Sequence, residues 1–550
     1  MEKSIGVLIL FLFINILSAQ EFEPYKEGGS KKFAELCMNF NNYREALVEY
    51  RALSQRDPQN PFYKHQIARC HLNLHEDKSR AIPVLSSLTK NIDYEESRVW
   101  YDLGRAYLAT GHIDSAEIAL QRYQEQNPEG RGNRIPAARL LAMCHNADSL
   151  MHDTVKAKIE NAGAAINSEH ADFFPLVTGD ESRLIFTTER PGNSARHITL
   201  KGRYNADLWK SRRHNESWRR ARRISSGRIN TRASEYGVSM TPDGNQLLLI
   251  YEPEQGNRFI LHAEHQRRHF SRPEPYSEKV INKEKYDMNG ACISKNEDLI
   301  IFSATTGEDN SNFNLYISQR DPDEGQWSEP EKMGPQINTA YNDAYPVLTP
   351  DENYLVFASE GHNSMGGYDL MITPFSTDTN HNYKVRNIGY PINTTIDDKS
   401  ITFTQDMRYA YKSFLKSGGY GDLDIYRITL PDTNSRYSHV KGSITIEGIN
   451  SAWEDTASDT SNEAATSVSI LPYTDVEIEV FHTETREPSG KWEVDPVEGN
   501  FHIKLPPGDY EVHFHYPGYR SEQIHVELSG AQKKNKIINQ DIKIKTKESE

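Results

Sequence analysis

The sequence predicts a multidomain protein in which an all-α repeat superhelix is followed by a five-bladed β-propeller and then by a small β-sandwich. Three observations support this fold class. One pattern of short apolar runs and acidic turns returns five times between Asp172 and Leu430, at intervals of about fifty residues. A helical pattern with a period of about 34 residues precedes it. Alternating apolar and polar residues follow it, as in half-buried strands.

Length, charge and the first residues set the outer limits. At 550 residues the chain is too long for one hydrophobic core, and its net charge of −15 argues against nucleic acid as the main partner. Residues 1–20 contain an apolar run from Ile5 to Leu17 followed by small residues, which predicts a signal peptide cleaved near Ala19 or Gln20. We therefore expect export. No later stretch has the length and apolarity of a transmembrane span.

The four cysteines are few for an exported chain of this size, so disulfides are not expected to be its framework. Cys37 and Cys70 occupy similar places in neighbouring helical repeats, which leaves a close pair as one alternative. Buried structural thiols are the favoured alternative, because cysteine is among the residues most often buried.

Residues 28–150 are expected to form the helical domain. Its best copy runs from Trp100 to Pro128 and has the spacings of a tetratricopeptide repeat. Small residues at Gly104 and Ala116 let two helices approach closely, and Pro128 ends the second helix. Stacked repeats of this kind present a groove to a protein segment. The alternative is a purely structural support for the propeller.

Residues 153–431 are assigned to the propeller, and a short signature indicates how the ring closes. An isoleucine followed by an asparagine ends each outer strand, at positions 166–167, 229–230, 281–282, 337–338 and 392–393. The first copy precedes the first blade, and no copy follows the fifth. The segment before Ser168 is therefore predicted to join the last blade, which protects free strand edges. Five blades are expected, with six as the alternative.

Residues 437–532 alternate as the strands of a small antiparallel sandwich do. A polar, acidic insertion at Asn450 to Ser469 interrupts the first strands and is expected to be a mobile loop. Residues 533–550 form a charged tail with one further strand predicted at Asp541 to Ile544.

One feature of the propeller is not repeated from blade to blade. The outer part of the first blade is densely basic in a chain that is acidic as a whole. Guanidinium groups in such a patch can hold an anionic partner, and the alternative is a solvated outer strand. The candidate residues are Arg212, Arg213, Trp218, Arg219, Arg220, Arg222 and Arg223.

The sequence carries none of the common short motifs of catalysis. The sequence contains no G-x-S-x-G elbow, H-E-x-x-H pair, P-loop or EF-hand loop. His262 and His265 share an H-x-x-H spacing, which on a strand sends the two rings to opposite faces. We therefore expect no catalytic residue, no metal site and no cofactor, and a chain that is not an enzyme. A hydrolase with a hidden site is the remaining alternative.

The order of the modules carries a family resemblance. The turns of the blades, as at Pro350 to Ser359, resemble WD40-like (PD40) repeats of the TolB kind. The strands around Val440 to Gly442, Phe501 to Tyr510 and Gly518-Tyr519 look like a carboxypeptidase regulatory-like domain. Signal peptide, helical repeats, propeller and this module, in that order, are similar to the PorE-type component of the type IX secretion system. Those proteins usually end in an OmpA-like domain that grips peptidoglycan, and too few residues follow the sandwich here for one.

The resemblance implies a non-enzymatic scaffold in the periplasm or at the outer membrane, within or near a secretion or gliding assembly. Its expected partners are proteins of the cell envelope or of the secretion machinery. The alternative is a binding module for peptidoglycan or another anionic glycan of the envelope, with the propeller face as the receptor. No nucleic acid partner is expected.

Overall fold

The computed structural model divides the chain into two compact units, Met1–Leu430 and Pro431–Glu550, and each is described by itself. The structure describes residues 29–430 and 438–545. The gaps within these ranges are 92–93, 95, 129–132, 196–197, 215–216, 225–228, 254, 267–268, 278–280, 307–311, 378–382, 447–472, 474, 484–485, 487, 493, 496–498, 506–508 and 529–536. The predicted signal peptide and the insertion at 450–469 lie outside the described residues. No described helix is long and apolar enough to cross a membrane.

The first unit begins with helices whose starts follow ordinary capping chemistry. The side chains of Ser30, Asn42 and Asn60 accept hydrogen bonds from backbone N–H groups in the first turns that follow them. Pro61 occupies the first turn of its helix, where no N–H is needed. The described helices are α2 (Lys31–Asn39), α3 (Tyr43–Arg56), α4 (Pro61–Asn73), the 3₁₀ helix η1 (Lys78–Arg80), α5 (Ala81–Leu88), α6 (Arg98–Ala109), α7 (Ile113–Gln126) and α8 (Ala137–His152).

Consecutive helices pack through small residues at the points where they cross. At Gly104 in α6, an added Cβ would lie 2.6 Å from the side chain of Leu120 in α7, so only glycine fits there. Ala116 is fully buried in the same contact. All four cysteines are buried free thiols, and burial raises the pKa of Cys70 to about 12.

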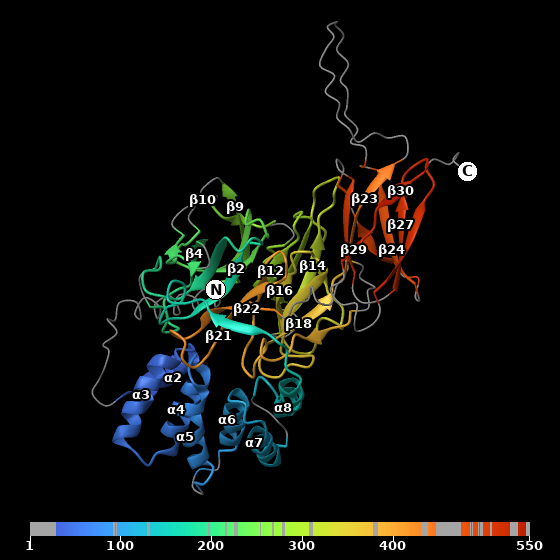
Figure 1. Ribbon diagram of the computed structural model, residues 1–550. Helices are drawn as coiled ribbons and strands as arrows, with labels where there is room; N and C mark the ends of the chain where they lie inside the picture. The colour runs from blue at the N-terminus through green and yellow to red at the C-terminus, as the bar shows by residue number, and fades with distance from the viewer. Residues whose placement is uncertain are drawn as a thin grey trace. The chain divides into compact units, whose positions relative to one another are not determined.

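The prediction of an all-α tetratricopeptide superhelix is wrong. The described residues contain seven α-helices, about 21% of the described residues are helical, and these helices belong to the same compact unit as the sheets. The physical reason lies in α8, which packs its apolar side chains on α6 and α7 and also turns polar side chains toward the sheets. The Nη2 atom of Arg139 donates to the carbonyl of Gly361 at 2.7 Å, and the amide of Asn146 donates to the carbonyl of Ser364 at 2.9 Å. Figure 1 shows the helices gathered at one end of the sheets.

Five antiparallel sheets of one repeated strand order follow in the described part of this unit, and they are propeller-like. We call each sheet a blade. Blade 1 has β2 (Asp172–Val177), β3 (Arg183–Thr188), β4 (Asp207–His214), β5 (Ser217–Trp218) and β6 (Arg222–Arg223). Blade 2 has β7 (Ser234–Met240), β8 (Gln246–Glu252), β9 (Phe259–Gln266), β10 (His269–Phe270) and β11 (Glu274–Pro275).

The remaining blades keep the order. Blade 3 has β12 (Tyr286–Ile293), β13 (Leu299–Thr306), β14 (Asn314–Gln319) and β15 (Glu331–Lys332). Blade 4 has β16 (Asp343–Leu348), β17 (Tyr354–Ser359), β18 (Asp369–Pro374) and β19 (Arg386–Asn387). Blade 5 has β20 (Thr402–Phe403), β21 (Tyr409–Phe414), β22 (Asp424–Thr429) and, as its outer strand, β1 (Lys158–Asn161). The last pairing is antiparallel, with Ile159 opposite Ile428.

The repeated isoleucine and asparagine have separate tasks in this arrangement. Each of the five isoleucines is buried, with at most 1% of its surface exposed. Each asparagine side chain accepts from the backbone N–H and donates to the backbone C=O of one residue in a third strand, at 2.7 to 3.0 Å. The pairs are Asn167 with Ile425, Asn230 with Leu208, Asn282 with Ile260, Asn338 with Leu315, and Asn393 with Leu370. The amide thus imitates a strand partner where the outer strand has ended.

The acidic turns between the first and second strands of the blades contain a recurring type of hydrogen bond. A threonine hydroxyl donates to the aspartate two residues later, at 2.6 to 2.7 Å, in the pairs Thr178 with Asp180, Thr241 with Asp243, Thr349 with Asp351, and Thr404 with Asp406. In blade 3 the hydroxyl of Ser294 donates to Asp298 instead, so Asn296 does not take this part.

The second unit has two sheets that share one apolar core. One sheet contains β23 (Ser438–Ile446), β26 (Asn500–Leu505), β29 (Ile537–Asn539) and β30 (Ile542–Ile544), and the last two run parallel to β23. The other contains β24 (Glu477–His482), β25 (Pro488–Trp492), β27 (Asp509–His515) and β28 (Glu522–Glu527). Val440, Val480 and Phe514 are fully buried between them. The expected domain boundaries stay predictions.

Candidate functional site

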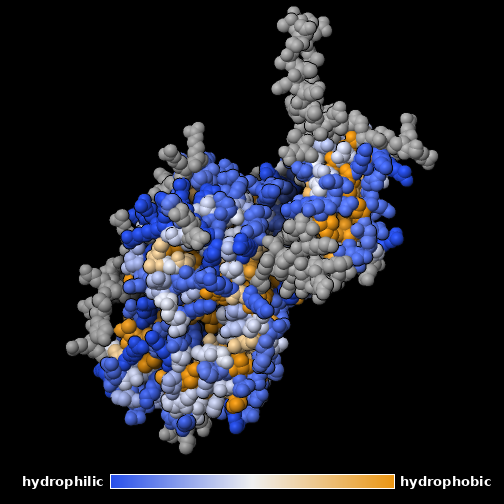
Figure 2. All heavy atoms as spheres, in the orientation of Figure 1, coloured by the Kyte–Doolittle hydropathy of each residue, from blue (hydrophilic) through white to orange (hydrophobic). Residues whose placement is uncertain are grey.

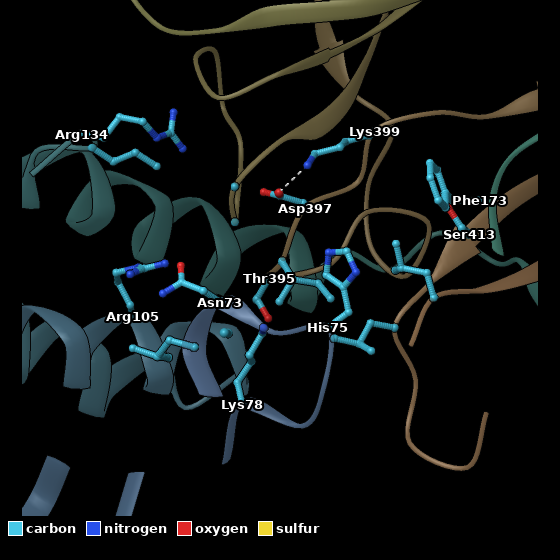
Figure 3. Close-up of a pocket in the computed structure, with 18 of the residues that line it drawn as sticks. Asn73, His75, Lys78, Arg105, Arg134, Phe173, Thr395, Asp397, Lys399 and Ser413 are labelled. Carbon is cyan, nitrogen blue, oxygen red and sulfur yellow. Dashed lines mark ion pairs between the residues drawn. The ribbon is translucent and has the colours of Figure 1, made fainter. Parts of the chain in front are cut away.

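The first unit encloses a cavity of about 690 Å³ between the helices and the blades. Helical residues such as Lys78 and Arg105 line it together with blade residues such as Phe174 and Lys399. Figure 3 shows Lys78 extending from the helical side toward Asp397 and Lys399 of blade 5. A volume of this size holds a small organic ligand.

The cavity is strongly basic, in contrast to the chain as a whole. Eight cationic side chains line it: Lys78, Arg98, Arg105, Arg134, Lys201, Arg203, Arg258 and Lys399. Three carboxylates oppose them: Glu189, Glu252 and Asp397. Because a cleft lined by one sign of charge concentrates ions of the other sign, the site favours an anion.

Most of these cations are already held by carboxylates. Arg134 makes a two-pronged contact with Glu360, with nitrogen to oxygen distances of 2.7 and 2.6 Å. Lys399 lies 2.9 Å from Asp397, and burial, which alone would raise the pKa of Asp397, is outweighed by this lysine, so that the pKa falls to about 2. These pairs fix the walls of the cavity.

Lys78 and Arg105 are held less completely. The Lys78 ammonium donates to the carbonyl of Leu74, and no carboxylate among the described residues forms an ion pair with it. Burial, and then the charge of Arg105, lowers the pKa of Lys78 to about 8. Arg105 lies 3.6 Å from Asp102, a carboxylate that also contacts His65 at 3.0 Å.

The surroundings of His75 disfavour a positive charge on its imidazole. Burial lowers its pKa to about 3, and the charges of Arg203, Lys399 and Lys78 act in the same direction. The imidazole is therefore neutral at physiological pH, and it can donate one hydrogen bond and accept another.

Aromatic side chains from the blades form one wall, which we call the aromatic wall: Phe173, Phe174, Tyr236 and Tyr345. The Phe174 ring lies 5.0 Å from that of Phe173 and 5.5 Å from that of Tyr345, measured between ring centroids. Phe174 and Tyr345 sit at register shifts in β2 and β16, with φ angles of 48° and 53°. Such angles are costly for bulky residues, so the blades hold these rings in place at the expense of local strain.

The predicted arginine patch lies on the outer strands of blade 1, away from these cavity-lining residues. Arg213 forms an ion pair with Glu181, and its guanidinium lies 6.0 Å from the ring centroid of Trp218. Arg223 donates to the hydroxyl of Ser194 at 3.2 Å. These three patch residues therefore take part in packing within unit 1.

The other four patch residues are exposed: Arg212, Arg219, Arg220 and Arg222. Binding of an anionic partner by them stays a prediction. The described residues contain no group of three or more His, Cys, Asp or Glu side chains that could hold a metal ion. Sequence reasoning missed the cavity entirely, because its cations come from segments more than three hundred residues apart and form no local motif.

No family model matches the chain, and no curated protein matches it. Solved structures that resemble it include TolB from Acinetobacter baumannii, which is 15% identical with a TM-score of 0.31, over 54% of this chain and 71% of that one. A glycoside hydrolase is 10% identical with a TM-score of 0.37, over 52% of this chain and 95% of that one. Likenesses of this size carry no argument about what this chain binds.

A TolB structure from Agrobacterium tumefaciens is also similar, at 12% identity with a TM-score of 0.27, over 50% of this chain and 99% of that one. The helical repeats, the carboxypeptidase regulatory-like domain and the secretion component find no support in these structures.

The expectation that the chain is not an enzyme is corrected. The similar structures include the glycoside hydrolase, an oligogalacturonate lyase from Vibrio parahaemolyticus and the catalytic domain of an α-L-arabinofuranosidase from Coprinopsis cinerea. The absence of short catalytic motifs does not exclude an enzyme, and the reason is physical. In a ring of blades, reacting groups come from different strands and leave no contiguous signature.

Proposed function

We propose that this protein is an interaction module of the cell envelope that binds a protein partner over the helical side of its first unit. The observation that carries this proposal is the placement of exposed apolar side chains. Large apolar groups gathered on one side of a protein mark surfaces that partners cover.

Seven large hydrophobic side chains are exposed among the described residues: Leu36, Phe40, Val48, Ile118, Ile198, Leu200 and Tyr420. The first four belong to α2, α3 and α7 or their ends. Figure 2 shows hydrophobic residues at the surface in the region that Figure 1 assigns to the helices. The other three lie in blade loops that meet the helices.

Two contacts place those blade loops. Gly202, close to Leu200, leaves no room for a Cβ beside Asn42, the residue that caps the start of α3. Asp422, close to Tyr420, lies 3.6 Å from Arg44 in α3. The exposed apolar residues therefore gather around one side of the unit, whereas scattered single residues would need no explanation.

The family resemblance is the basis for proposing a cellular location and an assembly for this chain. We propose that the chain is exported to the periplasm, associates with the outer membrane and acts within or near a type IX secretion or gliding assembly. The signal-peptide pattern of residues 1–20 and the propeller-like repeats of the sequence support this assignment. Binding of peptidoglycan or another anionic glycan is the second candidate, and the four exposed arginines of blade 1 favour it.

Crosslinking in intact cells tests the proposal. A photoreactive amino acid is placed at Leu36, Phe40 or Ile118, and captured proteins are identified by mass spectrometry after the cells are fractionated. The matched control position is Glu331, an exposed residue on β15. We expect envelope proteins to be captured at the helical positions and not at the control. Equal capture at Glu331, or a chain recovered without any captured partner, contradicts the proposal.

A further inference from the structure

We propose that the cavity between the helices and the blades binds an acidic sugar, with the sugar ring against the aromatic wall and the carboxylate at Lys78. This inference concerns the interior of the first unit, so it does not depend on the partner surface proposed above. It is carried by the charges, the aromatic rings and the uncharged polar groups that meet in one cavity.

The charge of the cavity selects an anion. Eight cationic side chains face three carboxylates there, although the whole chain carries a net charge of −15. An acidic protein that only needed solubility would gain nothing from collecting cations around an internal space. Seven of these cations form ion pairs with carboxylates of the lining or just behind it, so Lys78 is the cation that an entering anion would pair with.

The ammonium group of Lys78 is the cation that such an anion would stabilise most. It stands in η1, between α4 and α5, and its ammonium has a backbone carbonyl but no carboxylate partner among the described residues. A partly buried ammonium without a counter-ion is unfavourable, and a bound carboxylate would supply the counter-ion. Arg105 lies on the same side of the cavity and adds a second positive charge near this point.

The aromatic wall selects a ring. The four side chains of the wall are only half-buried, although they come from first strands at the centre of the blades. Phe174 and Tyr345 keep strained backbone angles at this place. Aromatic faces bury a large apolar area at low cost in conformational entropy, which suits the apolar face of a sugar ring.

Uncharged polar groups complete the lining and suit hydroxyl groups. Asn73, His75, Thr395 and Ser413 line the cavity, and Figure 3 shows them around the space that Lys78 enters. Because His75 is neutral, it can either donate to or accept from a hydroxyl. A bare inorganic anion would use the cations and leave the aromatic wall and these groups without a partner.

Binding measurements on the full chain test the proposal. Glucuronic acid, N-acetylmuramic acid, glucose and inorganic phosphate are titrated by calorimetry at pH 7. We expect at least one of the two acidic sugars to bind at least tenfold more tightly than glucose and than phosphate. The Lys78→Met and Phe173→Leu variants should each weaken that binding at least tenfold, and Lys78→Arg should restore most of it.

The matched control is Lys90→Met, which removes an exposed lysine of the helical region and should leave binding unchanged. Circular dichroism and thermal melting of each variant separate lost binding from lost folding. Four outcomes overturn the proposal: no probe binds, glucose binds as tightly as the acidic sugars, phosphate binds as tightly as they do, or folded Lys78→Met binds as the wild type does. Capture at Leu36 or Phe40 by crosslinking should persist in Lys78→Met, so the two proposals fail separately.

Discussion

Replacement of Lys78 by methionine should make the protein more stable at pH 7, although it removes a hydrogen bond. In the fold, burial and the charge of Arg105 lower the pKa of Lys78 from 10.5 to about 8. The charged form is therefore disfavoured in the folded state relative to the unfolded state. A residue kept at a cost to stability is a candidate for a functional role.

The magnitude follows from the two pKa values. A change from 10.5 to about 8, at about 1.36 kcal/mol per pKa unit, gives an upper bound of about 3 kcal/mol. Lys78 is partly exposed, so solvent screening reduces this to about 2 kcal/mol. Loss of the hydrogen bond to the Leu74 carbonyl destabilises the variant by about 1 kcal/mol. The net expectation at pH 7 is a gain of about 1 kcal/mol in the free energy of unfolding.

The difference in the free energy of unfolding between Lys78→Met and the wild type must change sign as the pH rises. The cost of the charge is fully present below the folded pKa of about 8 and disappears above the unfolded pKa of 10.5. At pH 10.5 and above, only the lost hydrogen bond should remain, so the variant should be slightly less stable than the wild type. The charged groups that set this pKa include Arg105, Asp397, Glu76 and Asp422.

Urea unfolding, followed by tryptophan fluorescence at pH 7 and pH 10.5, measures the difference between the variant and the wild type. Lys90→Met serves as the control, because its side chain is exposed. A Lys78→Met variant that is less stable than the wild type at pH 7, or a difference that does not change with pH, would refute the reasoning.

Three further predictions concern the contacts that hold unit 1 together. Arg139→Met should lower the free energy of unfolding by about 3 kcal/mol, because buried carbonyls of blade 4 lose a charged donor; urea unfolding against the exposed Arg122→Met checks this. Asn338→Ala should cost about 3 kcal/mol and lower the melting temperature, because it leaves the buried N–H of Leu315 unpaired and removes one of the two hydrogen bonds that the C=O of Leu315 accepts. Asp369→Asn should stabilise the protein increasingly as pH rises above about 4, because burial, and then the charge of a neighbouring aspartate, raises the pKa of Asp369 and favours its neutral form in the fold.

Each of these predictions has a clear contrary result. If Arg139→Met were no more harmful than Arg122→Met, the helices would be loosely tethered to the blades. An Asn338→Ala variant with an unchanged melting temperature would mean that the amide does not replace a strand partner. A stability difference for Asp369→Asn that is constant between pH 4 and pH 8 would show that the carboxyl is not kept neutral.

The blades could be read from the sequence because their chemistry is local. The threonine and aspartate of four of the five acidic turns stand two residues apart, and an isoleucine and an asparagine adjoin at each outer strand. Such short-range patterns survive in one dimension. The first copy of the second pattern also indicated where β1 belongs, since Asn167 bonds to β22.

In the helical region, local sequence patterns predicted the close packing of two helices but not the contacts of the whole region. The spacing around Gly104 indicated two closely packed helices, and the contact with Leu120 has that form. The same spacing also suggested a self-contained superhelix, which is wrong. α8 packs on α6 and α7, and its further contact with blade 4 depends on Arg139 finding backbone carbonyls more than two hundred residues away in the chain.

The sequence by itself determined the repeats, their turns and the composition of the modules, because each depends on neighbours within a few residues. Only the tertiary structure decided that helices and blades form one unit and that they enclose a basic cavity with an aromatic wall. Lys78 reaches that cavity from the helical side and Lys399 from the side of the sheets. Their proximity follows from the closure of the ring and the packing of α8 on blade 4, which are long-range contacts that no local spacing encodes.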